Sequence, residues 1–130
     1  MRRFAIIMAA LLAAPAAGAQ EQSATAAETA LLAEIATCLA TGLPSDWRQA
    51  EMIVELAKPG AETGTARYLV MRNLSGGQYE SFAPCIDFQP ARRLTTDLRK
   101  LQPAERRDWK GARFVVYSDG KFDLTLDYSK

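Results

Sequence analysis

The sequence predicts a small α+β domain in which helices cover one face of an antiparallel sheet. Three observations favour this class: two stretches with helical spacing of apolar residues, a run of three strand-like stretches between them, and a hairpin at the end. Strands that follow one another without intervening helices are typical of antiparallel sheets. We therefore expect a single domain over residues 20–130 with the element order α-β-β-β-α-β-β.

The closing stretch, WKGARFVVYSDGKFDLTLDY, predicts a β-hairpin around Ser118-Asp119-Gly120. A two-residue turn would pair Val116 with Asp123, which sets an apolar side chain opposite a charged one. A three-residue turn with a left-handed glycine instead pairs Val116 with Phe122. The same register continues with Phe114 opposite Leu124 and Ala112 opposite Leu126. We expect this second register, whose apolar face needs a cover because a lone hairpin is marginal in water.

Two amphipathic helices are expected to supply that cover. The first begins at the capping box formed by Thr25 and Glu28, and Gly42 and Pro44 end it. Its apolar positions are Leu31, Leu32, Ile35, Cys38 and Leu39. The second begins at Pro90, a residue suited to the first turn of a helix. Its apolar side is formed by Ala91, Leu94, Leu98 and Leu101 before Pro103 interrupts the pattern.

The stretch WRQAEMIVEL admits two interpretations. Its apolar residues fit helical spacing, but Ala50, Met52, Val54 and Leu56 also alternate with polar residues as in a strand. We interpret it as a strand because the alternation is cleaner and the turn residues Pro59-Gly60 follow at once. Two further strands are expected at Thr65–Arg72 and Gln78–Ala83, with a turn at Ser75-Gly76-Gly77 between them.

Residues 1–19 have the pattern of a secretory signal peptide. Arg2 and Arg3 precede the apolar run Phe4–Leu12, and small residues lead to the A-x-A pattern Ala17-Gly18-Ala19. The apolar run is short for a membrane span. We expect a mature chain that begins near Gln20, has no transmembrane span, and is periplasmic or extracellular; a retained membrane anchor is the alternative.

The two cysteines fit this exported location. They cannot complete a four-ligand zinc site, and they lack the C-x-x-C spacing of redox exchange. In an exported chain, Cys38 on the first helix and Cys85 after the third strand predict a structural disulfide. Two separate buried thiols are the alternative.

The residue inventory argues against catalysis. The chain has no histidine, and so it lacks the commonest general base and metal ligand. Asp123 and Asp127 lie about 13 Å apart on one strand, too far to share a cation, and Asp119 suits the hairpin turn. We expect a protein that is not an enzyme, with no catalytic residue, cofactor or metal.

Charge is distributed unevenly along the chain. Without Arg2 and Arg3 the net charge falls from +1 to −1, which disfavours a nucleic-acid partner. Residues 92–113 carry eight basic and three acidic groups, whereas residues 20–91 carry four and nine. These basic groups are either the solvated side of the second helix or a strip that steers an acidic protein or an anionic envelope surface. The candidate partner-binding residues are Arg92, Arg93, Arg99, Lys100, Arg106, Arg107, Trp109, Lys110 and Arg113. For Trp109 the alternative is that its large ring seals the edge between the second helix and the sheet.

The chain resembles the YezG-like immunity proteins of bacterial polymorphic-toxin systems. The resemblance is carried by GLPSDWRQAEMIVEL, LTTDLRKL and the closing hairpin sequence. It implies a small α+β protein that neutralises a cognate toxin, usually in the cytoplasm; the signal peptide and the cysteine pair depart from that pattern. The resulting expectation is an exported, non-catalytic binding protein, an immunity-like inhibitor that masks a protein partner with an acidic surface. The alternative is a periplasmic accessory domain that binds a small or polymeric envelope ligand.

Overall fold

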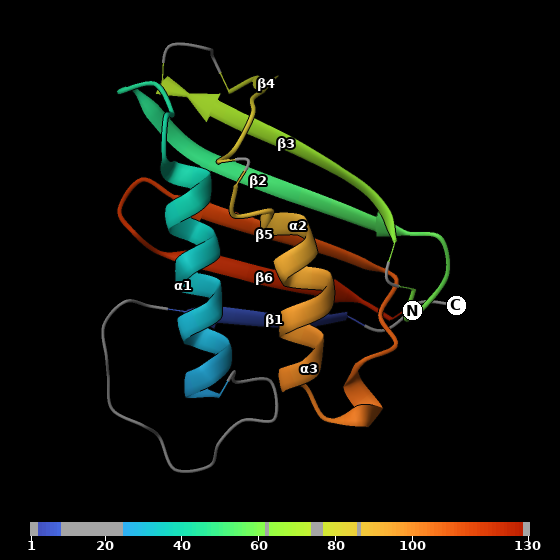
Figure 1. Ribbon diagram of the computed structural model, residues 1–130. Helices are drawn as coiled ribbons and strands as arrows, with labels where there is room; N and C mark the ends of the chain where they lie inside the picture. Colours follow the sequence, from blue (N-terminus) through green and yellow to red (C-terminus); the bar gives the residue numbers. More distant parts are fainter. Residues whose placement is uncertain (1–2, 9–24, 62, 74–76, 86, 129–130) are drawn as a thin grey trace.

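The computed structural model describes residues 3–8, 25–61, 63–73, 77–85 and 87–128. Figure 1 shows a single antiparallel sheet with the main helices packed in front of one face. The predicted α+β class and the order α-β-β-β-α-β-β are confirmed over residues 26–127. Of the expected turn at Ser75-Gly76-Gly77, residues 75 and 76 lie outside the described part of the chain.

The elements are as follows. The helical segments are α1 (Ala26–Ala40), α2 (Pro90–Arg92), η2 (Arg93–Leu98), α3 (Arg99–Leu101) and η3 (Ala104–Arg106). The strands are β1 (Arg3–Met8), β2 (Trp47–Leu56), β3 (Gly64–Arg72), β4 (Tyr79–Ser81), β5 (Gly111–Tyr117) and β6 (Phe122–Asp127). They lie in the order β1-β6-β5-β2-β3-β4.

Strand β1 is an addition to the predicted order. It pairs antiparallel with β6, from Arg3 opposite Asp127 to Met8 opposite Phe122. The export pattern alone does not predict this pairing, but an apolar segment can also complete the open edge of a sheet. The expected cleavage pattern and Gln20 lie outside the described residues, and removal of the N-terminal segment therefore stays a prediction.

The terminal hairpin has the predicted three-residue turn. The Gly120 N–H donates to the Tyr117 carbonyl at 3.0 Å, and the Tyr117 N–H donates to the Lys121 carbonyl at 2.9 Å. Gly120 has φ 94°, a left-handed conformation that favours glycine. Val116 lies opposite Phe122, and the apolar match continues along both strands. The expected register is confirmed.

The strand interpretation of WRQAEMIVEL is also confirmed. This stretch is β2, which lies between β3 and β5 in the middle of the sheet. Its alternate residues Ala50, Met52, Val54 and Leu56 are buried in the core beneath the helices. Burial on one face is what a period of two predicts for a strand in a half-covered sheet.

The second helix is continuous from Pro90 to Leu101 but π-helical at its centre, in η2. Leu94 and Leu98 are fully buried as expected, whereas Leu101 is 41 % exposed. A π-helical turn holds more residues than an α-turn, so the positions after it rotate relative to the sheet. Gln102 takes the buried place instead, and the expectation that Leu101 lies on the apolar side was wrong.

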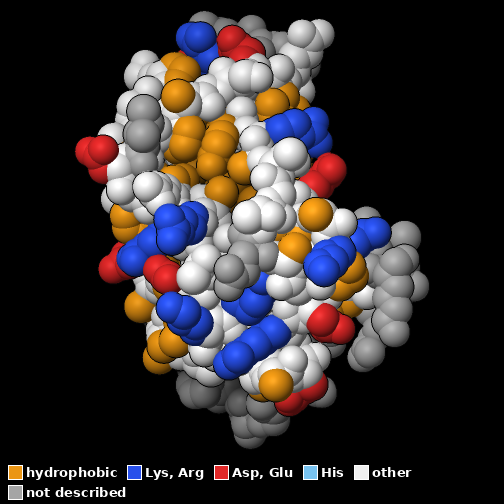
Figure 2. All heavy atoms as spheres, turned by 45° about the vertical axis from the view of Figure 1, so that its right-hand side comes forward, with side chains coloured by type: hydrophobic (Ala, Val, Ile, Leu, Met, Phe, Trp, Pro, Cys, Tyr) orange, Lys and Arg blue, Asp and Glu red, His pale blue; other side chains and the backbone are white. Residues whose placement is uncertain are grey.

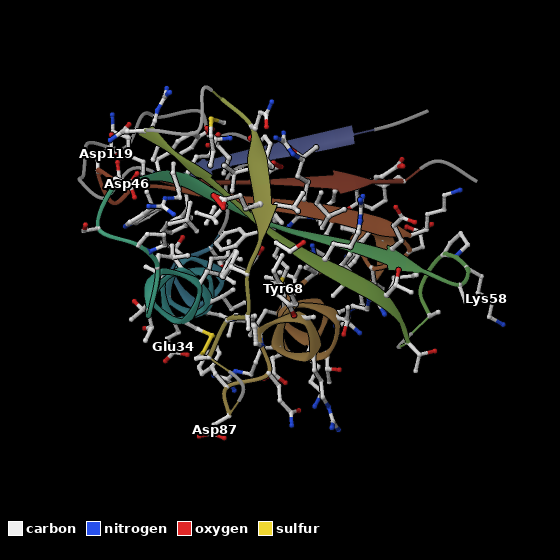
Figure 3. The ribbon with its side chains drawn as sticks, turned by 90° about the horizontal axis from the view of Figure 1, so that it is seen from above. Glu34, Asp46, Lys58, Tyr68, Asp87 and Asp119 are labelled. Carbon is white, nitrogen blue, oxygen red and sulfur yellow. A yellow bond between two sulfur atoms is a disulfide. The ribbon has the colours of Figure 1, made fainter. Side chains whose placement is uncertain are left out.

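The predicted disulfide is present. Cys38 and Cys85 are bonded, with their Cα atoms 5.3 Å apart, and they join α1 to the segment that follows β4. Figure 3 shows α1 and the second helix nearly end-on, on the same side of the sheet, with Tyr68 of β3 above the second helix. Within the described residues, no helix has the length and apolar character needed to cross a bilayer.

Candidate binding surfaces

Two of the nine candidate partner-binding residues belong to the interior. Trp109 is fully buried, and its indole Nε1 donates to Gln102 Oε1 at 3.0 Å. The Arg99 guanidinium lies 4.5 Å from the centre of the Trp109 ring and donates to the carbonyls of Gly60 and Ala61, at 3.0 and 2.8 Å. Neither side chain is available to a partner, and we remove both from the candidate surface.

Two further arginines hold neighbouring parts of the fold. Arg93 pairs with Glu34 of α1 at 3.0 Å and with Asp97 at 2.9 Å. Arg107 donates to the main-chain carbonyls of Gln102 and Lys100, at 2.6 and 3.3 Å. Carbonyls at a helix C-terminus lack partners within the helix, and Arg107 therefore caps the end of α3.

Arg113 lies on the opposite side of the molecule. It alternates along β5 with Ala112 and Phe114, which face the core. Its side chain pairs with Glu51 of β2 on the sheet face that the helices do not cover. The sheet therefore separates Arg113 from the basic residues of the second helix, and the predicted strip does not form one continuous surface.

Five basic residues belong to the second helix and the segment directly after it. We call Arg92, Arg93, Lys100, Arg106 and Arg107 the basic surface. Arg92, Arg93 and Lys100 lie on the second helix, where Arg92 and Lys100 are exposed, and Arg106 and Arg107 follow it in η3 and at its end. Figure 2 shows Lys and Arg side chains collected over the lower half of one face of the molecule, with apolar side chains above them. Lys110 is half-buried and lines a separate hollow beside Lys58 and Asp127.

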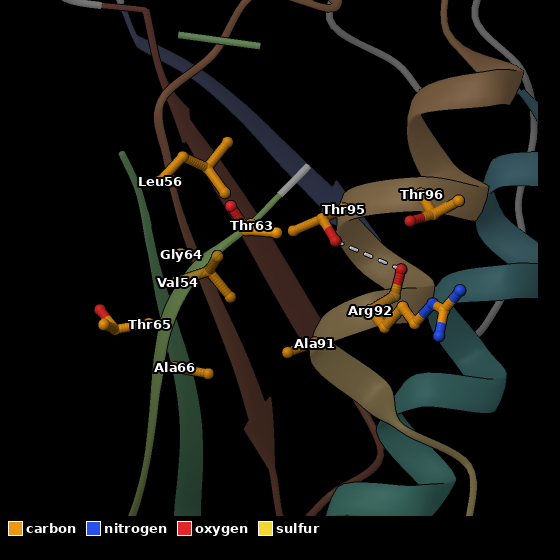
Figure 4. A pocket seen from close by; sticks show the side chains of 10 residues that line it. All are labelled: Val54, Leu56, Thr63, Gly64, Thr65, Ala66, Ala91, Arg92, Thr95 and Thr96. Carbon is orange, nitrogen blue, oxygen red and sulfur yellow. Dashed lines mark hydrogen bonds between the residues drawn. The ribbon is translucent and has the colours of Figure 1, made fainter. Parts of the chain in front are cut away.

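A cleft lies between β3 and the second helix (Figure 4). Its volume is about 420 Å³, within the range of small-ligand sites. Figure 4 shows Val54, Leu56 and Ala66 facing the helix, while the Arg92 side chain points away from the strands. The Thr95 hydroxyl, which donates to the Arg92 carbonyl at 3.3 Å, is one of several threonine hydroxyls at the cleft. The lining is therefore apolar with a hydroxyl-bearing rim.

Glu51 is an unexpected buried carboxylate on the open face of the sheet. It is 3 % exposed although its position in β2 alternates with the core residues. The hydrogen bond that it accepts from Arg113 is the main reason why the pKa of Arg113 is raised. This pairing offsets the cost of burying the charge. The alternation along β2 predicts a polar position at Glu51 but does not identify its partner, because that depends on the register between β2 and β5.

Two tyrosines border this ion pair. Tyr79 accepts a hydrogen bond from Gln49 Nε2 at 2.6 Å, and Tyr117 donates to Asp123 Oδ2 at 3.1 Å. Burial and then a nearby carboxylate, Glu51 for Tyr79 and Asp123 for Tyr117, raise the pKa of both phenols. Phenols with raised pKa values stay protonated at neutral pH, so these two groups do not supply a general base there.

The fold and these surfaces define the class of the protein as a small, disulfide-linked α+β domain with a basic helical side. Neither the protein-family models nor the curated proteins compared with this chain give a match. The resemblance to YezG-like immunity proteins therefore stays a prediction.

No single sequence signal marks the cleft. Its lining comes from β2, β3 and the second helix, and each lining residue fits the ordinary pattern of its own element. The space lies between the helix and the strands, and is therefore a property of the packed molecule. By contrast, the basic surface is visible in the sequence as a local excess of Lys and Arg.

Proposed function

We propose that this protein is an exported, non-catalytic binding protein whose basic surface docks onto an acidic protein partner. The observation that carries the proposal is the placement of exposed Arg92 and Lys100 on the second helix and of Arg106 and Arg107 on the segment directly after it. Charges arranged in this way speed the encounter with a partner of opposite charge. An immunity-like role, in which the domain masks a toxin, is what the family resemblance implies, and the disulfide is of the kind that persists in oxidising compartments.

The test begins with the oxidised protein purified after export and used as bait in envelope extract. With a captured partner in hand, we compare the wild type with the double charge reversal Arg92→Glu/Lys100→Glu. Both side chains are exposed, and reversal should lower the association rate by about tenfold at low salt and weaken its salt dependence. The thermal midpoint should change little because exposed charges contribute little to folding.

A matched control separates the basic surface from net charge. Arg48→Glu/Arg67→Glu changes the net charge by the same amount at exposed positions on β2 and β3. This control should retain most of the wild-type association rate. If both double variants slow association equally, or neither does, the partner does not use the basic surface.

The cleft favours a second candidate function, an envelope accessory domain that binds a small or polymeric ligand. Ala66→Leu should fill the cleft, since Ala66 faces the helix in Figure 4. Arg67→Leu changes the next residue of the same strand, which is exposed and does not line the cleft. Native mass spectrometry of exported protein should show a bound small molecule that Ala66→Leu loses and Arg67→Leu keeps. If the native masses of wild type and Ala66→Leu differ only by the mass of the substitution, the substitution displaces no bound molecule. That result contradicts this candidate function.

A further inference from the structure

Strand β6 carries backbone hydrogen-bonding groups that point away from β5. Tyr117 and Lys121 form a hydrogen-bonded pair next to the turn, and such pairs alternate with non-bonded ones in antiparallel strands. Phe122, Leu124 and Leu126 therefore occupy the non-bonded positions opposite β5. Their N–H and C=O groups point toward β1, the strand on the other side of β6.

Removal of residues 1–19 would leave this edge open. The two outermost strands of the sheet are β1 and β4. At the β4 end the edge strand has only three residues, a common way to limit edge pairing. Loss of β1 would instead expose a six-residue edge bordered by Phe122, Leu124 and Leu126, which are all buried in the present structure. An edge of this length and apolar character favours pairing with another strand.

A second copy of β6 matches this edge in one antiparallel register. When two copies are centred on Leu124, Phe122 lies opposite Leu126 and Lys121 lies opposite Asp127. A register centred on Thr125 would place Asp123 opposite Asp127, two like charges. A register centred between Leu124 and Thr125 would place Phe122 opposite Asp127. Only the first of these three registers pairs apolar with apolar residues and joins opposite charges.

We propose that the processed protein is a homodimer in which two β6 strands pair antiparallel about Leu124. The two-fold axis stands perpendicular to the sheet, so the two sheets continue into one and both sets of helices cover the same face. In the unprocessed chain β1 occupies this edge, and removal of residues 1–19 is therefore the step that permits the dimer. The proposal rests on that removal and is independent of the proposed acidic partner.

The test uses the protein exported by bacteria and purified as it is processed, with intact mass to establish its first residue. Sedimentation equilibrium should show a concentration-dependent dimer. Lys121→Glu and Asp127→Lys should each raise the dimer dissociation constant by about tenfold or more, since each sets like charges opposite one another twice in the symmetric pair. The Lys121 side chain also lies 3.9 Å from Asp119, but both groups are exposed and their pairing is weak.

Mixing the two variants supplies the decisive measurement. In a one-to-one mixture, Glu at position 121 of one chain faces Lys at position 127 of the other, while the native pair forms at the second site. The mixture should therefore recover a heterodimer of near wild-type affinity. Arg67→Glu, on β3 and separated from β6 by β2 and β5, changes charge equally to Lys121→Glu and should leave the dimer intact.

Several outcomes overturn the proposal. They are a processed protein that stays monomeric, single variants that dimerise like the wild type, a mixture that does not associate, or an exported protein that retains residues 3–8. The proposal is also overturned if the protein is a monomer whose β6 edge binds a different protein, because that protein would then take the place proposed for the second copy. Far-UV circular dichroism of each variant shows whether loss of the dimer follows from misfolding; restored association in the mixture excludes that cause directly.

Discussion

Arg99 acts as a structural arginine at the junction of three segments. Its guanidinium stacks on Trp109 and binds two carbonyls in the turn between β2 and β3. The planar guanidinium group stacks on the ring and donates to the carbonyls at the same time, and the single ammonium group of lysine cannot do both. This role explains why a basic residue of the candidate strip is 9 % exposed.

At this residue we predict that Arg99→Lys lowers the free energy of unfolding by about 1–3 kcal/mol, through the loss of carbonyl hydrogen bonds and of ring stacking. Lys100→Ala, at the adjacent exposed position, should change it by less than about 0.5 kcal/mol. Urea unfolding of both variants checks the difference. Equal midpoints would contradict the structural role of Arg99.

The tyrosines of the open sheet face predict a loss of stability at alkaline pH. The pKa of Tyr79 and that of Tyr117 are raised above the ordinary value of 10.0, so the folded state holds these protons more tightly than the unfolded state. Their contribution is complete below about pH 10 and is lost as pH rises through the folded pKa. Urea midpoints measured from pH 8 to 11 should therefore fall less steeply in Tyr79→Phe/Tyr117→Phe. If the wild type and the double variant lose stability in parallel, the phenols do not contribute to this pH dependence.

At the scale of elements, the π-helical centre of the second helix decides which leucines are buried. Leu94 and Leu98 lie in the core, and the change of phase moves Leu101 to the surface. An uninterrupted α-helical pattern predicts the same side for all of them. The extra residue in the π turn thus places Gln102 where it can accept the hydrogen bond from Trp109.

This phase change gives a matched pair of substitutions. Leu98→Ala should cost about 2–5 kcal/mol because it leaves a cavity in the core. Leu101→Ala removes the same atoms from a side chain that is 41 % exposed and should cost less than about 1 kcal/mol. Denaturant unfolding compares the two directly, and similar losses would contradict the difference in burial between Leu98 and Leu101.

At the scale of the whole molecule, the disulfide joins α1 to the segment between the sheet and the second helix. Cys38 and Cys85 are separated by 47 residues, and a loop of this length restricts the unfolded chain considerably in the chain-entropy model. The bond therefore fixes one end of the helical layer to the strand region that precedes the second helix.

For the whole domain we predict that Cys38→Ser/Cys85→Ser lowers the free energy of unfolding by about 2–5 kcal/mol. Chemical reduction of the wild type should produce a similar loss and should leave the double variant unchanged. Alkylation and intact mass of protein purified from its native cells report the state of the thiols. Two thiols that react without prior reduction would mean that the bond does not form in the cell.

The features that the sequence by itself determined are those that depend on patterns among neighbouring residues. The capping box at Thr25, the alternation in β2 and the match of Val116 with Phe122 each follow from residues close in the chain. Steric and hydrogen-bonding rules over a few residues are enough to select a helix start, a strand face or a hairpin register. The two cysteines added one long-range constraint because the chain offers them no other partner.

What only the tertiary structure decided is how those elements lie relative to one another. The sheet places Arg113 on the face opposite Arg92, although both belong to one basic stretch of sequence. Register between β2 and β5 buries Glu51 beside Arg113, and packing against β3 leaves the cleft beside the second helix. Periodicity identifies which side of an element is apolar, but it contains no information on which distant element covers that side or which edge stays open. Those choices are made by packing between segments far apart in the chain, and they determine the surfaces available to a partner.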